Sequence, residues 1–209
     1  MAKTPPPHWD LSNVYPGLDS AEFNQALKTL SSQINAFEAF FANKVSASST
    51  QSSAEELGKL AEEVLNRFNE SNDLAETISS YIYSFISTDS FNQLAKRVLS
   101  QFEQIEVNLR MLGVQAQQWI GSIADRLPEI MQVSELAQAH AFFLQETAEQ
   151  SRYLMSEAEE SLAAALSLSG TSGWEKLQGT VTSQLKIKFD LDGEEQELSS
   201  PALINLHSH

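Results

Sequence analysis

Hydrophobic side chains recur every three or four positions along most of this chain, which is the period of an amphipathic helix. Three long stretches follow the pattern, at residues 19–43, 53–87 and 91–123. Asp19 and Glu22 have the three-residue spacing of a capping box at the start of the first stretch, and a similar pair opens the second. Because short connections join them, the three helices are expected to lie antiparallel as a bundle.

The helical pattern changes at Pro128, because proline lacks the amide donor that a continuing helix needs. We expect one helix over residues 128–150, a second from a capping box at Ser156 to a stop at Gly170, and a short third from a capping box at Ser172. The second half of the chain is therefore predicted to contain shorter helices than the first.

Near the C-terminus the period changes from that of a helix to that of a strand. Residues 185–191 alternate between apolar and polar side chains, so one face of this strand is apolar. Asp192-Gly193 is typical of a two-residue hairpin turn, and residues 194–198 supply the returning strand. A last helix is expected to begin after Pro201.

Together these elements predict a mainly α fold: an antiparallel bundle of long helices, followed by short helices and one small β-hairpin. We divide the chain into residues 1–125, with the N-terminal segment and the bundle, and residues 126–209, with the shorter helices and the hairpin. No stretch approaches the roughly 18 consecutive apolar residues of a membrane span. The opening residues also lack the layout of a secretory signal. We therefore expect a cytoplasmic protein.

Charge and cysteine content exclude several classes of function. The chain has 13 Lys and Arg against 28 Asp and Glu, a formal net charge of −15. Such a charge repels phosphate groups, so neither nucleic acid nor a membrane surface is an expected partner. The chain contains no cysteine, which excludes disulfides, thiol nucleophiles and cysteine-ligated zinc, and fits a reducing compartment.

The motifs that suggest chemistry are incomplete. None of the four histidines belongs to an H-E-x-x-H motif, and His207 and His209 lack a third ligand. Ser183 and Lys186 match an S-x-x-K string but enter a strand rather than a helix, and residues 190–193 suit a tight turn better than a calcium loop. We predict no catalytic, cofactor-binding or metal-ligating residue in this chain, and substrate-binding residues stay unknown.

Aromatic residues lead to two further expectations. The turn-rich segment 9–16 contains two aromatic and two aliphatic residues, which favours docking onto a hydrophobic surface. Trp119, Trp174 and the pair Phe142-Phe143 are candidates for lining a binding groove, although aromatic residues at helical spacing usually belong to a core.

Three blocks of sequence and the predicted hairpin follow one another in an order that can be compared with known families. Residues 9–16, WDLSNVYP, are similar to the pattern W-D-L-x-x-[LV]-Y-P. Residues 153–160 resemble L-S-x-x-x-E, and residues 170–177 resemble G-x-x-x-W-x-x-L. With the hairpin at 185–194, this order resembles the N-terminal region of the oligoendopeptidase F family, a branch of the thimet-oligopeptidase-like zinc metallopeptidases.

The resemblance implies the non-catalytic helical part of a zinc-dependent oligoendopeptidase that hydrolyses short peptides in an enclosed channel. In that family the zinc is held by an H-E-x-x-H motif in a later domain, which has no counterpart here, so this chain alone is expected to be inactive. The implied partners are its own missing catalytic domain and short peptide substrates. This interpretation also predicts exposed apolar surface centred on the hairpin and the last helix. The alternative is a non-enzymatic acidic helical interaction or scaffold protein, which needs no second part.

Overall fold

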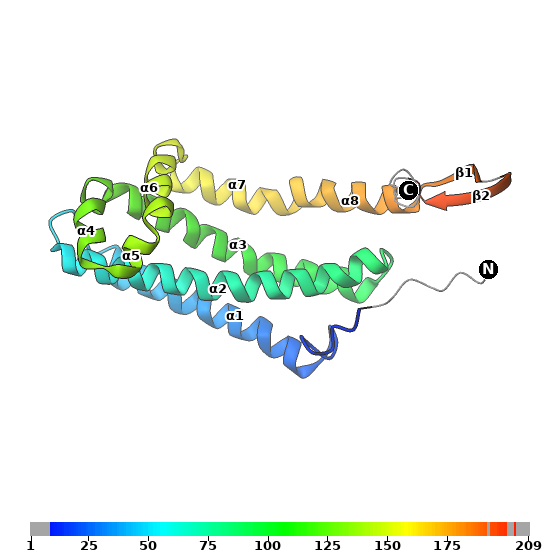
Figure 1. Cartoon of the computed structure of the whole chain (residues 1–209), viewed down its shortest axis with the longest axis horizontal. Helices are drawn as coiled ribbons and strands as arrows, with labels where there is room; N and C mark the ends of the chain where they lie inside the picture. The colour runs from blue at the N-terminus through cyan, green and yellow to red at the C-terminus, as the bar shows by residue number, and fades with distance from the viewer. Residues whose placement is uncertain (1–8, 192, 200–202, 204–209) are drawn as a thin grey trace.

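Three long helices form the body of the molecule, as the hydrophobic pattern predicts (Figure 1). The computed structural model describes residues 9–191, 193–199 and 203. The long helices are α1 (Ala21–Phe40), α2 (Ala54–Thr88) and α3 (Gln93–Ser122). Neighbouring helices run antiparallel, and each contributes its apolar face to one core in which Phe37, Ile78 and Phe102 are fully buried. Burial of each such side chain contributes about 1.5–3 kcal/mol to folding.

Side-chain caps fix where the long helices begin. The predicted cap at Ser53 is confirmed, since its hydroxyl accepts a hydrogen bond from the Glu56 N–H at 3.1 Å. The predicted cap at Asp19 is wrong by one residue, because Ser20 accepts from the Phe23 N–H, also at 3.1 Å. Sequence spacing alone therefore locates a helix start to within a residue, and the hydrogen bond decides it.

Two other boundaries of the bundle differ from expectation. Phe91 does not belong to the third helix but precedes it, with 59% of its surface exposed, because Asn92 caps α3 by accepting from the Ala95 N–H at 3.0 Å. The first helix does not continue regularly to residue 43. After α1 the chain forms a π-helical turn, Phe41–Val45, which directs Phe41 and Val45 into the core.

The single helix expected over residues 128–150 is wrong, because the structure has three short helices there. They are α4 (Leu127–Val133), α5 (Glu135–Ala139) and α6 (Ala141–Gln150). The first break is at Ser134, whose backbone is extended and whose hydroxyl accepts from the Ala137 N–H at 3.0 Å. The second is at His140, whose Nδ1 lies 3.0 Å from the carbonyl oxygen of Leu136. Such local side-chain bonds compete with the regular helix and end it.

The last described helices are α7 (Glu157–Ser169) and α8 (Thr171–Gln184), separated by Gly170 as predicted. The capping box at Ser156 is confirmed, but the one at Ser172 is wrong, because α8 begins directly after Gly170 and Ser172 lies inside its first turn. A Cβ atom at residue 170 would lie 3.0 Å from the carbonyl oxygen of Leu166, which explains why glycine suits this junction.

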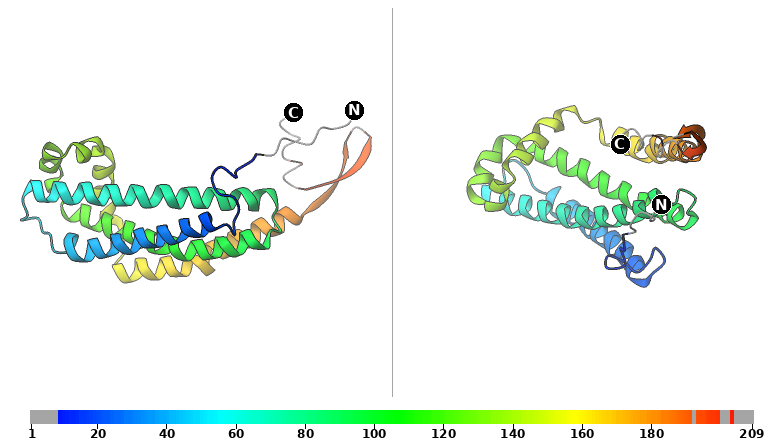
Figure 2. Two further views of the ribbon diagram at one scale, coloured as in Figure 1. Left: turned by 90° about the horizontal axis from the view of Figure 1, so that it is seen from below. Right: turned by 45° about the vertical axis from the view of Figure 1, so that its right-hand side comes forward.

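The predicted hairpin is confirmed as β1 (Lys186–Leu191) and β2 (Glu194–Ser199), which pair antiparallel with Ile187 opposite Leu198. Gly193 has a φ of 87°, the left-handed conformation that a two-residue hairpin turn requires. The helices α7 and α8 run alongside α3, and the hairpin extends beyond the end of the bundle (Figure 2).

The mainly α fold class is thus confirmed, and the division at residue 125 stays a prediction. The helix expected after Pro201 falls outside the described residues except at Leu203. Among the helices of the described ranges, none is both long enough and apolar enough to cross a bilayer.

Candidate functional site

The residues considered for chemistry do not form a reactive group. His8, His207 and His209 lie outside the described residues, and His140 occupies the junction between two short helices. The expectation that Ser183 enters the strand is wrong, because Ser183 lies in α8 and its hydroxyl donates to the carbonyl oxygen of Thr180 at 2.9 Å within that helix. Across residues 9–191 and 193–199, no three His, Asp or Glu side chains gather in a way that would hold a metal ion.

The N-terminal segment docks on the bundle through some of its aromatic and aliphatic residues. The Tyr15 ring packs edge-on against Phe23 and Tyr81, with centroid distances of 5.3 and 5.1 Å, and the Tyr81 hydroxyl donates to the Tyr15 carbonyl at 2.7 Å. Burial raises the pKa of both tyrosines. Docking is therefore confirmed for Tyr15 and for Leu11, whereas Trp9 is exposed.

The aromatic residues that were candidates for lining a binding groove do not lie together in one groove. Trp119 belongs to the core, and its indole N–H donates to the Ser48 hydroxyl at 3.1 Å. Trp174 on α8 and Phe142 on α6 are both on the surface. Of these residues, Trp174 is part of a larger apolar surface.

The last two helices and the hairpin carry a series of exposed large apolar side chains. We call it the outer strip. Its members are Leu162, Leu166, Trp174, Leu177, Val181, Leu185, Ile187 and Phe189. Their exposed fractions range from 44% for Phe189 to 71% for Trp174. For the hairpin, this exposure agrees with the apolar surface that the peptidase interpretation predicts.

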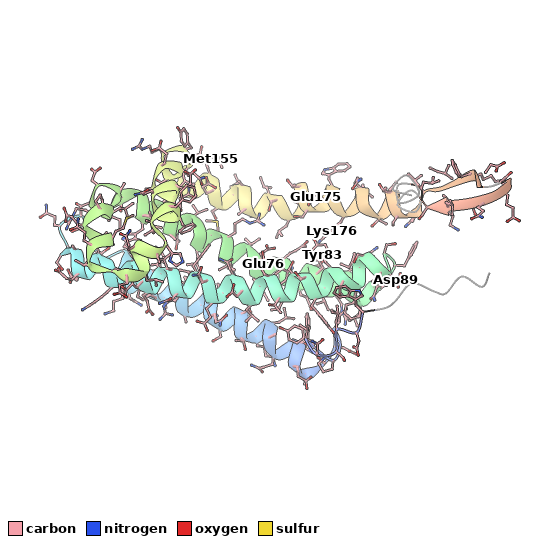
Figure 3. The ribbon with its side chains drawn as sticks, in the orientation of Figure 1. Glu76, Tyr83, Asp89, Met155, Glu175 and Lys176 are labelled. Carbon is pink, nitrogen blue, oxygen red and sulfur yellow. The ribbon has the colours of Figure 1, made fainter. Side chains whose placement is uncertain are left out.

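The outer strip faces away from the bundle, because the opposite side of the same helices faces α3. Lys176 of α8, labelled in Figure 3, forms an ion pair with Glu103 of α3, and Ala164 of α7 is buried. At 100° per residue, Trp174 lies about 200° around the helix from Lys176. No residue of α8 is buried. On α8 the usual arrangement of an amphipathic helix is therefore reversed, with a polar contact inward and apolar side chains outward.

A groove of about 410 Å³ lies between α2 and α3, and we call it the α2–α3 groove. Its lining includes apolar side chains such as Phe68, Phe102 and Leu109, together with the charged side chains of Glu106 and Arg110. Glu76 on α2 lines the same groove. This combination of an apolar lining and a few charges is typical of small-ligand sites.

Carboxylates gather beyond one end of the groove. Tyr83, one turn of α2 past the groove-lining Ser79, has a raised pKa, first through partial burial and then through the carboxylates of Glu103, Glu106 and Glu175. Glu103 and Glu106 come from α3 and Glu175 comes from α8. At this end, therefore, carboxylates from α3 and α8 lie near Tyr83, and one of them, Glu103, is paired with Lys176.

Sequence reasoning missed the α2–α3 groove. Glu106 and Arg110 lie one turn apart on α3, a spacing that usually indicates a solvated helix face. Gly113 was the available signal, because an isolated glycine within a 30-residue helix usually has a packing or functional reason. A Cβ atom at this position would lie 3.4 Å from the Phe68 ring.

Comparison with known proteins gives one match. The family model described as Oligopeptidase F, for an N-terminal domain of M3 peptidases, matches residues 124–187. No curated protein and no solved structure matches the chain. The matched segment begins just before α4 and ends within β1, so it includes every residue of the outer strip except Phe189. The resemblance noted in the sequence is confirmed over this segment, and the match supports an N-terminal part of an M3-family peptidase.

Proposed function

Since residues 124–187 are similar to the N-terminal domain of oligopeptidase F, we propose that this chain is the non-catalytic helical part of a zinc-dependent peptidase. The whole enzyme would hydrolyse short peptides in an enclosed channel, in the cytoplasm. The long helices suit one wall of such a channel, which admits unfolded peptides and excludes folded proteins. The described residues offer no ligand set for zinc, so zinc belongs to the catalytic domain in this proposal.

The observation that carries the proposal is the exposure of large apolar side chains on α7 and α8. An exposed row of large apolar side chains is unfavourable in water, and contiguous apolar patches on soluble proteins mark interaction sites. The row coincides with the segment that matches the peptidase family. We therefore assign the outer strip to the interface with the catalytic domain, where each side chain that becomes fully buried contributes about 1.5–3 kcal/mol.

The first experiment tests zinc-dependent peptide hydrolysis. The native protein that contains this chain is assayed with a quenched fluorescent peptide, with and without a chelator. We expect the chelator to abolish hydrolysis, zinc to restore it, and the 209-residue chain to be inactive alone. Hydrolysis that the chelator does not affect, or hydrolysis by the purified chain, would contradict the proposal.

The second experiment tests the interface. The double variant Trp174→Ser, Leu177→Ser is made in the same native protein, and its hydrolysis rate is compared with that of Phe142→Ser. Phe142 is 81% exposed but lies on α6, outside the outer strip. We expect the strip variant to lose most activity and the control to keep it. Equal activity of the two variants would remove the outer strip from the interface.

A further inference from the structure

The α2–α3 groove has the size and the lining of a site for a small ligand. Its volume of about 410 Å³ lies in the range of roughly 300–1,000 Å³ that is usual for such sites. The apolar part of the lining is anchored in the core, because Phe102 and Leu109 are buried. The apolar lining is therefore part of the bundle itself and forms without any rearrangement of the helices.

Gly113 lines the groove beside the Phe68 ring. A Cβ atom at this position would make a van der Waals contact with that ring at 3.4 Å, so glycine leaves this part of the ring accessible. Glycine costs about 1 kcal/mol relative to alanine within a helix. Glycine at residue 113 therefore lowers the stability of the helix and leaves an apolar surface accessible to a ligand.

The charged side chains of the groove have few partners within the protein, and those of Glu76 and Arg110 are exposed to solvent. Of the four other arginines, Arg67, Arg126 and Arg152 each form an ion pair with a glutamate, and Arg97 forms none within the described residues. Arg110 forms none within the described residues, and its guanidinium donates only a long hydrogen bond, of 3.5 Å, to the Ser167 hydroxyl. Within those described residues, the carboxylates of Glu76 and Glu106 also form no ion pair and accept no hydrogen bond.

The spacing of these charges fits the two ends of a short peptide. Glu106 and Arg110 are four residues apart on α3, about 6.0 Å along the axis. Glu76 lines the groove from the neighbouring helix. An extended peptide spans at most about 3.3–3.6 Å per residue, so the ends of a dipeptide are about 7 Å apart. A guanidinium binds a carboxylate through two parallel hydrogen bonds, and a carboxylate binds an ammonium group.

We propose that the α2–α3 groove binds a short peptide with free ends and an apolar side chain, most simply a dipeptide. Arg110 binds the terminal carboxylate, Glu76 and Glu106 bind the terminal ammonium group, and the apolar side chain lies against Phe68 and Leu109. The inference rests on the proposed function, because an oligopeptidase consumes and releases peptides of this class. It places a peptide site on the helical part, away from the catalytic domain.

Calorimetric titration of the 209-residue chain tests the site. The probe is the dipeptide leucyl-phenylalanine, compared with its N-acetylated and C-amidated forms. We expect the free dipeptide to bind and each blocked form to bind at least about tenfold more weakly, because each loses one charged contact. Equal affinity for the free and blocked forms, or no binding of the free dipeptide, would overturn the proposal.

Variants of the chain localise the binding. Arg110→Met removes the carboxylate contact, and Gly113→Leu fills the groove without changing its charge, so both are expected to weaken binding at least tenfold. Arg97→Met is the matched control, because Arg97 is an exposed arginine on the same helix outside the groove. Circular dichroism confirms that each variant is folded. Unchanged binding by both groove variants would also overturn the proposal.

These titrations separate the inference from the proposed function, because they need no catalytic domain. If the chain fails to bind dipeptide while the chelator and outer-strip experiments succeed, the groove site is wrong and the peptidase assignment stands. If the chain binds dipeptide but the native protein hydrolyses peptides without zinc, the site stands and the assignment is wrong.

Discussion

Lys176 of α8 and Glu103 of α3 form the ion pair that joins the last described helix to the bundle. The Glu103 side chain is only 14% exposed, so its charge is largely removed from water. No residue of α8 is buried. The position of α8 therefore depends on this pair and on the packing of α7, to which Gly170 connects it.

Breaking that pair should release α8. The variant Lys176→Met is expected to widen the distribution of distances between spin labels at Gln101→Cys on α3 and Gln178→Cys on α8. The chain has no cysteine, so labelling is unambiguous. Lys186→Met is the control, because Lys186 lies 4.0 Å from Glu197 within the hairpin. An unchanged distribution in Lys176→Met would show that other contacts hold α8.

The outer strip should make the isolated chain bind hydrophobic dyes. In Trp174→Ser, Leu177→Ser we expect clearly less dye fluorescence and less self-association in sedimentation than in the unmodified chain, because the most exposed apolar side chain of the strip is removed. Phe142→Ser serves as the comparison. A dye signal that falls equally in both variants would mean that exposed aromatic area in general, and not the strip, binds the dye.

The junction between α4 and α5 should depend on Ser134. This residue is only 2% exposed; its hydroxyl accepts from the Ala137 N–H and donates to Glu62 at 2.6 Å. Ser134→Ala removes both bonds and is expected to lower the free energy of unfolding by about 1–3 kcal/mol. Ser53→Ala, at the exposed start of α2, should cost less, about 0.5–1 kcal/mol. Urea denaturation measures both, and equal costs would contradict the role given to burial.

Two glycines should respond in opposite directions to alanine. At Gly121 a Cβ atom would collide with the hydroxyl oxygen and the Cβ of Ser151, so Gly121→Ala forces α3 and the turn Ser151–Tyr153 apart. We expect a loss of about 1–3 kcal/mol. At Gly179 nothing lies within 4 Å, and Gly179→Ala should stabilise α8 by about 0.5–1 kcal/mol. Thermal unfolding measures both, and stabilisation by Gly121→Ala would show that the close contact relaxes freely.

The start of α7 should be sensitive to acid. The hydroxyl and backbone N–H of Ser156 both donate to Glu159, and these bonds hold the Glu159 pKa below its ordinary value of 4.5. A lowered pKa in the folded state means that the stabilisation is fully present above pH 4.5 and is lost as pH falls through the folded-state value. The Ser156 amide signal in NMR should follow this titration. Glu159→Gln should remove it, and a titration that persists in this variant would assign it to another group.

The sequence was most informative where one local interaction decides the structure. The hairpin follows from strict alternation and Asp192-Gly193, and the caps at Ser53 and Ser156 follow from residue type and spacing. It was misleading where two local signals compete. Phe91 fits the helical period of α3, but the Asn92 cap excludes it, and Ser134 interrupts a segment whose composition suits one helix.

For the candidate sites, the sequence and the tertiary structure each decided different features. By itself the sequence determined that α7, α8 and β1 have an apolar face, because a period of 3.6 or 2 is a local property of the chain. Only the tertiary structure decided that this face points outward, since that direction depends on Lys176 finding Glu103 on another helix, 73 residues away. The α2–α3 groove likewise exists only once α2 packs beside α3, because its charges and its apolar lining come from two helices whose relative position no local pattern encodes.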